Sequence, residues 1–279
     1  MSGNKSIHFH ILEDIARDLS GEVNFPTCLD AAMLVRNTLK DPFVSVDQVV
    51  QAVGVEPLIS TKLLRLANSV TYNPSGNGLS DLGTAIGRLG FDVVRATSLA
   101  MAMDQMLKSR HLAAYDAIAR QTWEHSVQVA AIARVLARHI GRISPDAAML
   151  AGLVHKIGVF YLMYRAAEYP EYRNNEPAMT ELLLGWHEGV GESLLHILGV
   201  PDTITDAVRD QSQLRNVETP CSISDVLFFA KLLADSPDVW RSDSHPIDDA
   251  LREAERVRYG DLLKEAQDDI QELRSALSA

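Results

Sequence analysis

One stretch of the sequence constrains the fold more than any other: AAMLAGLVHKIGVFYLMY, residues 147–164, is apolar around nearly its whole helical circumference. Ser144 precedes it as a candidate N-cap and Pro145 takes the first helical position, so we predict one helix from Pro145 to about Tyr164. Other elements must surround a helix that has no polar face. The stretch therefore predicts a bundle with this helix at its centre.

Helical periodicity continues through most of the chain, while alternating β-branched runs of strand length are scarce. His125, Val129, Ile132 and Leu136 share one face of a helix predicted over residues 115–139, ending near Gly141. Further helices are predicted over residues 179–198, 201–215 and 223–234. Residues 26–107 predict several short helices, with N-termini near Ser45, Asp47 and Gln48 and near Ser80 and Asp81. The fold class predicted is all-α, a multi-helix bundle.

The chain of 279 residues, 47% of them hydrophobic, is long enough to bury a substantial core. We expect an N-terminal helical extension (1–24), a main domain (25–234, with halves 25–110 and 111–234) and a charged helical tail (235–279). In the tail, a narrow apolar stripe predicts a helix that either docks on its own domain or forms a coiled-coil or homodimer contact. The stripe consists of Leu262, Ala266, Ile270, Leu273 and Leu277.

The net charge of −11 opposes binding to nucleic acid and to anionic membranes at long range. The sequence contains no run of eighteen apolar residues and does not begin like a secretory signal, so a cytoplasmic protein with no membrane contact is expected. Cys28 and Cys221 lie far apart without CxxC spacing, and both are predicted to be reduced core residues.

Two neighbouring residues, His155 and Lys156, interrupt the most apolar helix. Neither lies on a face that reads as solvent-exposed. A buried ammonium without a partner costs several kcal/mol, so Lys156 must reach water, pair with a carboxylate or lose its proton. We predict an ion pair.

Two further histidines are candidates for a site. His125 is also on an apolar helical face, and helices this close in sequence commonly pack antiparallel, so the imidazoles of His125 and His155 are placed where they can meet. Hydrogen-bonded core side chains are the plain alternative for both. For His187 the sequence favours an exposed or structural role.

Several segments in order resemble the HDOD family, a branch of the HD superfamily of helical metal-dependent phosphohydrolases found in bacterial signalling proteins. The resemblance covers residues 26–234. It rests on Leu63-Leu64-Arg65-Leu66-Ala67-Asn68-Ser69 with Tyr72, on Ala85-Ile86 and Leu89-Gly90, on Trp123 and His125-Ser126, and on Ala151-Gly152-Leu153-Val154-His155-Lys156-Ile157-Gly158. For residues 63–69, a packed helix with Asn68 as a cap is as good an interpretation as a binding surface.

The resemblance implies a degenerate metal site. The HD pattern uses a first His, a His-Asp doublet and a late Asp as ligands, and His125 and His155 match the two His roles. The doublet's Asp is Lys156 here, and the late Asp matches Lys231, with Asp225 as the alternative position. His187 matches a ligand of two-metal relatives, whereas their paired His positions correspond to Asp210 and Gln211.

Protonated lysines have no lone pair for a metal ion, so the sequence predicts no bound metal, no cofactor and no catalytic residue. The leading hypothesis is a non-catalytic signal-transduction module that binds a signalling protein partner or a small anionic ligand at His125, His155, Lys156 and Lys231. One alternative is a working phosphohydrolase acting on a nucleotide or cyclic dinucleotide through His125, His155 and His187.

A second alternative is a nucleic-acid-associated regulator. It draws on the basic residues Lys62, Arg65, Arg88 and Arg95 in the N-terminal half. The acidic net charge opposes it.

Overall fold

The computed structural model describes residues 4–20, 29–172, 175–215, 217–236, 238–240 and 249–277. These residues form helices and connecting turns, with no strand among them, which confirms the all-α prediction. The first half contains α1 (Asn4–Ser20), α2 (Asp30–Thr38), α3 (Val46–Gly54), α4 (Pro57–Ala67), α5 (Leu82–Leu89) and α6 (Phe91–Lys108). The second half contains α7 (Asp116–Ile140), α8 (Pro145–Val154), α9 (Ile157–Ala166), α10 (Glu176–Ile197), α11 (Asp202–Arg209), α12 (Ile223–Leu233), α13 (Asp249–Arg258) and α14 (Gly260–Leu277). Two 3₁₀ turns, η2 (Arg110–Tyr115) and η3 (Pro170–Tyr172), complete the described elements.

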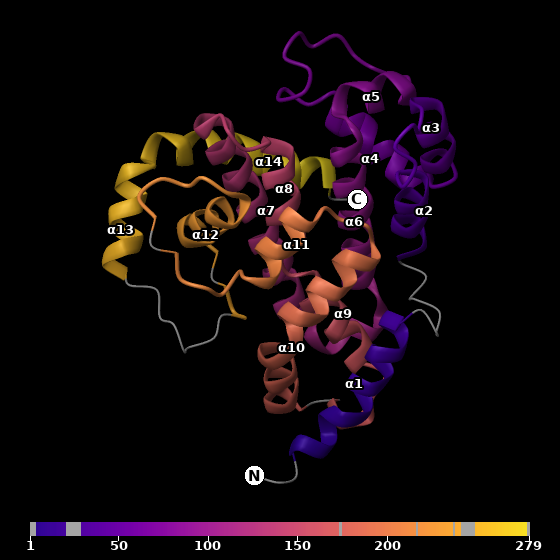
Figure 1. Ribbon diagram of the computed structural model, residues 1–279, viewed down its shortest axis with the longest axis vertical. Helices are drawn as coiled ribbons and strands as arrows, with labels where there is room; N and C mark the ends of the chain where they lie inside the picture. The colour runs from indigo at the N-terminus through magenta and orange to yellow at the C-terminus, as the bar shows by residue number, and fades with distance from the viewer. Residues whose placement is uncertain are drawn as a thin grey trace.

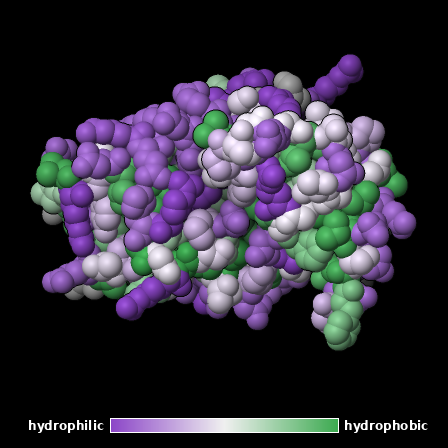
Figure 2. All heavy atoms as spheres, turned by 90° about the horizontal axis from the view of Figure 1, so that it is seen from above, coloured by the Kyte–Doolittle hydropathy of each residue, from purple (hydrophilic) through white to green (hydrophobic). Residues whose placement is uncertain are grey.

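Helices α6 to α11 fill the middle of the molecule, with α2 to α5 at one end and α12 and α13 at the other (Figure 1). Helix α7 packs against α8, α12 and α14, and α9 packs against α10. Apolar side chains gather toward the end formed by α2 to α5 (Figure 2), where Phe43, Val55 and Leu58 are exposed. The centre of the bundle is where the histidine-bearing helices meet.

The helix starts follow the chemistry expected from the sequence. Ser45 caps α3 in a capping box with Gln48, Asp81 accepts a hydrogen bond from the backbone of Thr84, and Ser144 caps α8 ahead of Pro145. Gly141 ends α7 with a left-handed φ of 72°, a conformation that costs glycine little. These predicted boundaries are confirmed.

The prediction of one continuous helix from Pro145 to Tyr164 is wrong. The chain breaks at His155 and Lys156: α8 ends at Val154 and α9 begins at Ile157, with Lys156 at φ −107° and ψ 15°. The hydrophobic pattern of the sequence cannot reveal this turn, because the helices on both sides of it are buried and apolar. The break lets two buried polar side chains leave the helical register.

The stretch Pro145–Ala166 is also the one helical stretch among the described residues that is long and apolar enough to span a membrane. Its most apolar window is 89% buried inside the molecule, as in a core helix. This finding agrees with the central position predicted for the stretch.

The apolar stripe of the tail docks on its own domain. Ala266, Ile270, Leu273 and Leu277 of α14 are buried, and α14 contacts α7 and α4. Figure 1 shows α14 crossing from the α13 end toward α4, so one helix spans both ends of the bundle. The apolar stripe is therefore covered by other helices of the same chain.

Cys221 is exposed, so its prediction as a core residue is wrong. The residue precedes the capping box of α12 in a turn, and its thiol and backbone N–H both donate to Asp225. Apart from Pro220 and Ser222, no residue type in this segment indicates a turn. Cys28 lies outside the described residues.

Candidate functional site

Three histidines from different elements lie in the interior of the bundle. His125 is on α7, His155 is in the turn between α8 and α9, and His187 is on α10; all three are buried. The ring centroids of His125 and His155 are 5.4 Å apart, which confirms that the two imidazoles meet. His187, for which the sequence favoured an exposed or structural role, is buried.

Two glycines allow this convergence. A Cβ at Gly152 would lie 2.6 Å from Ala130 Cα, and a Cβ at Gly158 would lie 2.0 Å from the carbonyl oxygen of His187. Both distances are far below van der Waals contact. Helix α8 therefore approaches α7, and α9 approaches α10, as closely as backbones can.

The hydrogen bonds of the three rings define their tautomers. His155 Nδ1 donates to the carbonyl of Gly152 at 2.6 Å, His187 Nδ1 to that of Leu183 at 2.8 Å, and His125 Nδ1 to that of Ser236 at 3.1 Å. Because carbonyl oxygens only accept, the proton of each neutral ring is on Nδ1. The three Nε2 atoms are buried acceptors that have no hydrogen-bond partner among the described residues.

Burial keeps these rings neutral. Desolvation, with Lys156 and Lys231 nearby, lowers the pKa of His125 to about 4 even though Asp238 opposes the shift. Desolvation and Lys156 lower the pKa of His187 to about 3. The pKa of His155 is also well below its ordinary value, through burial and then the charge of Lys156.

Lys156 forms the predicted ion pair. Its side chain is 1% exposed, and Nζ lies 3.0 Å from Oδ1 of Asp238, a residue that follows α12. Burial alone would raise the pKa of Asp238, but Lys156 and Lys231 outweigh it and hold that pKa well below the ordinary value. Asp238 is therefore an anion inside the protein.

Lys231 completes the group from α12. Its Nζ donates to the carbonyl of Gln211 at 3.0 Å and lies 3.6 Å from Oδ2 of Asp238. Gln211 in turn donates to the carbonyl of His155 at 2.9 Å. Burial, and then repulsion from Lys156, lowers the pKa of Lys231 to about 8.

The remaining predicted positions lie apart from this group. Asp210 pairs with Arg209 at the end of α11. Asp225 caps α12 with Ser222 and accepts from Cys221, so it performs a structural role. Of the two candidates for the late acidic position, Lys231 is the one beside Lys156 and Asp238.

Sequence reasoning missed Asp238 and Ser236, which follow α12. Ser236 accepts from His125 through both its carbonyl and its hydroxyl oxygen, each at 3.1 Å. The available signal was the buried Lys156, which required a carboxylate from somewhere in the chain. Spacing could not identify a partner 82 positions away.

A divalent cation does not fit these side chains. Among the residues that the structure describes, no three His, Cys, Asp or Glu side chains are placed to share one ion. Protonated Lys156 and Lys231 have no lone pair to donate, and the carboxylate of Asp238 is paired with both. The interactions that the group makes within the chain are hydrogen bonds and the charge pairing of both lysines with Asp238.

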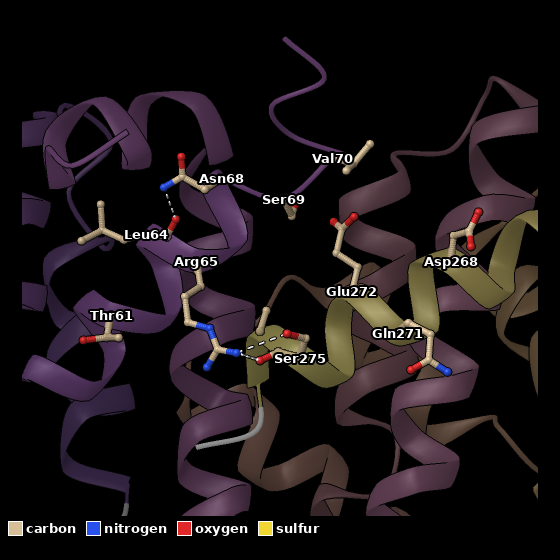
Figure 3. Close-up of a pocket in the computed structure, with 11 residues that line it drawn as sticks. Thr61, Leu64, Arg65, Asn68, Ser69, Val70, Asp268, Gln271, Glu272 and Ser275 are labelled. Atoms are coloured by element: carbon tan, nitrogen blue, oxygen red, sulfur yellow. Dashed lines mark hydrogen bonds between the residues drawn. The ribbon is translucent and has the colours of Figure 1, made fainter. Parts of the chain in front are cut away.

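We call the three histidines together with Lys156, Lys231, Gln211 and Asp238 the His–Lys cluster. This cluster is distinct from a large surface groove. That groove, of about 780 Å³, lies between α4 and α14, with Arg65, Asn68, Glu272 and Ser275 on its walls (Figure 3). Arg65 donates to Ser275, and Asn68 donates to Leu64 and Leu79. The segment of residues 63–69 thus combines the predicted cap with part of the wall of this groove.

Three of the basic residues considered for nucleic-acid binding, Lys62, Arg65 and Arg95, interact with other parts of the chain. Lys62 is buried and donates to the carbonyl of Leu277, and Arg95 pairs with Asp92 at 2.8 Å. Arg65 lines the α4–α14 groove, and Arg88 is exposed on α5. They do not form one surface stripe.

This all-helical bundle with histidines on three packed elements is of the HD-like class. The HDOD domain model matches residues 25–214, more than half of the chain. The chain therefore belongs to the HDOD domain family. No curated protein sequence matches it.

Solved structures share the fold. A "putative metal-dependent phosphohydrolase" from Shewanella amazonensis SB2B superposes with a TM-score of 0.75 at 20% identity over 100% of both chains. An HDOD domain protein of unknown function from Geobacter sulfurreducens has a TM-score of 0.58 at 22% identity, over 95% of this chain and 96% of that one. A "putative signal transduction protein" from Marinobacter aquaeolei VT8 has a TM-score of 0.59 at 18% identity, over 100% of this chain and 66% of that one.

Proposed function

We propose that this HDOD protein is a non-catalytic regulatory module that transmits a signal by binding a ligand or a protein partner, and that its phosphohydrolase site is inactive. The observation that carries the proposal is the pairing of Lys156 and Lys231 with Asp238 beside His125 and His155. A hydrolytic HD site needs carboxylates and a metal ion where this cluster has two cations.

The cost of burial supports the proposal. A buried ammonium is retained only when a carboxylate or hydrogen bonds compensate it, and here the carboxylate of Asp238 is used for that purpose. Placing a divalent cation among these groups would add charge repulsion from both lysines. The cluster is built to hold negative charge.

The runner-up is a working metal-dependent phosphohydrolase acting on a nucleotide or cyclic dinucleotide. One specific observation favours it: no described residue donates a hydrogen bond to the buried Nε2 atoms of His125, His155 and His187. Unpaired imidazole nitrogens are good ligands for transition metals. This candidate and the leading one differ in metal content and in turnover.

Elemental analysis of the full chain purified without chelator, combined with a phosphodiesterase assay, separates the two. We expect far less than one metal per chain and no turnover above that of a His155→Ala variant, the matched control for adventitious hydrolysis. One transition metal per chain, with turnover that His155→Ala abolishes, would support the working phosphohydrolase instead.

A further inference from the structure

The segment that follows α12 inserts its own anion into the His–Lys cluster. Asp238 contacts Lys156 at 3.0 Å and Lys231 at 3.6 Å, while Ser236 accepts from His125. Two residues further on, Trp240 is buried and its Nε1 donates to Thr122 of α7 at 2.8 Å. The position between the two ammonium groups is therefore occupied from within the chain.

Asp238 balances the cluster incompletely. Two ammonium groups face one carboxylate, which leaves one positive charge in excess when both lysines are protonated. Glu188 attracts Lys231 at longer range and accepts a hydrogen bond from Ser212, so Asp238 is the carboxylate in direct contact with both lysines. Because charge is screened poorly at a buried site, a dianion would be a better counterion than a single carboxylate.

The hydrogen-bond capacity of the cluster is also unmet. Within the part of the chain that the structure describes, the Nε2 atoms of His125, His155 and His187 have no donor and Oδ2 of Asp238 has no hydrogen-bond partner. A carboxylate only accepts, so it cannot satisfy imidazole nitrogens. Hydrogen phosphate, a dianion with one P–OH, accepts from both lysines and can donate to one of the imidazole nitrogens, which a carboxylate cannot do.

We propose that Lys156 and Lys231 form a site for a phosphate group, that Asp238 occupies this site in the free protein, and that phosphate displaces Asp238 and shifts Trp240. This inference rests on the proposed function, because it makes the inactive cluster the ligand-binding site. The movement of Trp240 away from Thr122 would be the output of the site.

The test uses the full chain in the presence of EDTA. Inorganic phosphate is titrated calorimetrically into wild type and Asp238→Asn at constant ionic strength, with chloride as the reference anion. Removing the internal competitor is expected to tighten phosphate binding by about tenfold or more. The matched control is Asp235→Asn, three residues earlier, which alters an exposed pair with Arg256 and should leave binding unchanged.

Two further variants identify the site. Lys231→Met and Lys156→Met, each in the Asp238→Asn background, should lose phosphate binding. Trp240 fluorescence should change on saturation in wild type, and Trp240→Phe assigns the signal, because Trp123 and Trp186 are the other two tryptophans. Parallel titration with a nucleoside monophosphate distinguishes a phosphate monoester from free phosphate as the tighter ligand.

Equal binding by wild type and a folded Asp238→Asn, or binding that survives both lysine changes, would overturn the inference. If Asp238→Asn does not fold, the wild-type fluorescence change and its loss in Lys231→Met decide the matter. Failure of phosphate binding would leave the metal and turnover results unaffected, so the proposed function is judged separately.

Discussion

The neutral histidines of the cluster link its structure to pH. In the folded protein burial lowers the pKa of His125 to about 4 and that of His187 to about 3, whereas an exposed histidine in the unfolded chain titrates near the ordinary value of about 6.5. Between these values the unfolded chain binds more protons than the folded one. The stabilisation that comes from keeping these histidines neutral is therefore fully present above about pH 6.5, and it is lost as the pH decreases through this window.

We predict that the free energy of unfolding decreases from pH 7 to pH 4, with each of these two histidines contributing on the order of 3 kcal/mol. His187→Gln should flatten the decrease because glutamine does not titrate. Denaturant unfolding at a series of pH values measures the slope. A slope that is unchanged in His187→Gln would show that this ring does not control acid stability.

Asp238 and Lys156 differ in what their removal leaves behind. Lys156→Met leaves Asp238 paired with Lys231, whereas Asp238→Asn leaves two ammonium groups facing each other without an anion. We predict a loss of about 1–3 kcal/mol for Lys156→Met and a larger loss, about 3–5 kcal/mol, for Asp238→Asn. Urea unfolding of both variants measures the order, and the reverse order would contradict this account of the cluster.

The sequence predicted that Lys156 needs an ion pair, but it did not identify the partner. Lys156 stands in an apolar helix, so burial and pairing follow from elementary electrostatics. Asp238 follows the predicted end of the main domain at residue 234, in a stretch whose charges read as solvated. Its role depends on a chain path after α12 that no local pattern specifies.

Among the elements, α9 and α10 show how closely the site depends on packing. The backbone of Gly158 lies against that of His187, and α9 has no room for a Cβ there. Moving α10 outward would displace His187 from the other two rings.

We predict that Gly158→Ala destabilises the protein by about 2–4 kcal/mol through this overlap with backbone. Gly189→Ala on α10 is the matched control: nothing lies within 4 Å of its Cβ position. The control should be neutral or stabilising by up to ~1 kcal/mol, because alanine favours helix. Thermal unfolding of the two variants compares them, and equal losses would contradict the packing argument.

Helix α14 is attached by a buried ion pair. Arg134 of α7 is 1% exposed, and its Nε donates to Oδ2 of Asp269 at 2.7 Å. The guanidinium also stacks over Tyr72, 5.5 Å from the ring centre, and so links α7 to the N-terminal half. Loss of Asp269 would leave a buried cation whose nearest remaining carboxylate among the described residues is Glu272, 3.9 Å away.

We predict that Asp269→Asn costs about 3–5 kcal/mol of unfolding free energy. Lys264→Ala on the same helix, which removes a highly exposed pair with Asp261, should cost less than about 0.5 kcal/mol. Urea unfolding of both variants provides the comparison. A small effect of Asp269→Asn would indicate that the apolar stripe alone holds α14.

Hydrophobic periodicity predicted the bounds of a helix correctly where one helical face is buried. It failed where the helix is buried on all sides. The 25-residue helix α7 was predicted to within about one residue because its polar face marks the register. The turn between α8 and α9 was missed because both flanking helices are apolar on all sides. The site lies at this turn, so the least predictable backbone carries the central residues.

On the scale of the whole molecule, the family match covers residues 25–214, but the cluster and the packing extend beyond it. Lys231 and Asp238 complete the His–Lys cluster from outside the matched range, and α14 packs against α4 and α7 within it. The all-α bundle could be predicted from periodicity, whereas the closing of the cluster by the segment after α12 required the three-dimensional structure.

We infer that Lys156 and Lys231 prevent this HDOD protein from holding a divalent metal ion. Equilibrium dialysis of the full chain against excess Mn²⁺ or Zn²⁺ measures this, with Lys156→Asp/Lys231→Asp as the comparison. We predict no stoichiometric metal on wild type and a gain of bound metal in the double variant. One metal per wild-type chain, lost in His125→Ala and in His155→Ala, would contradict the account.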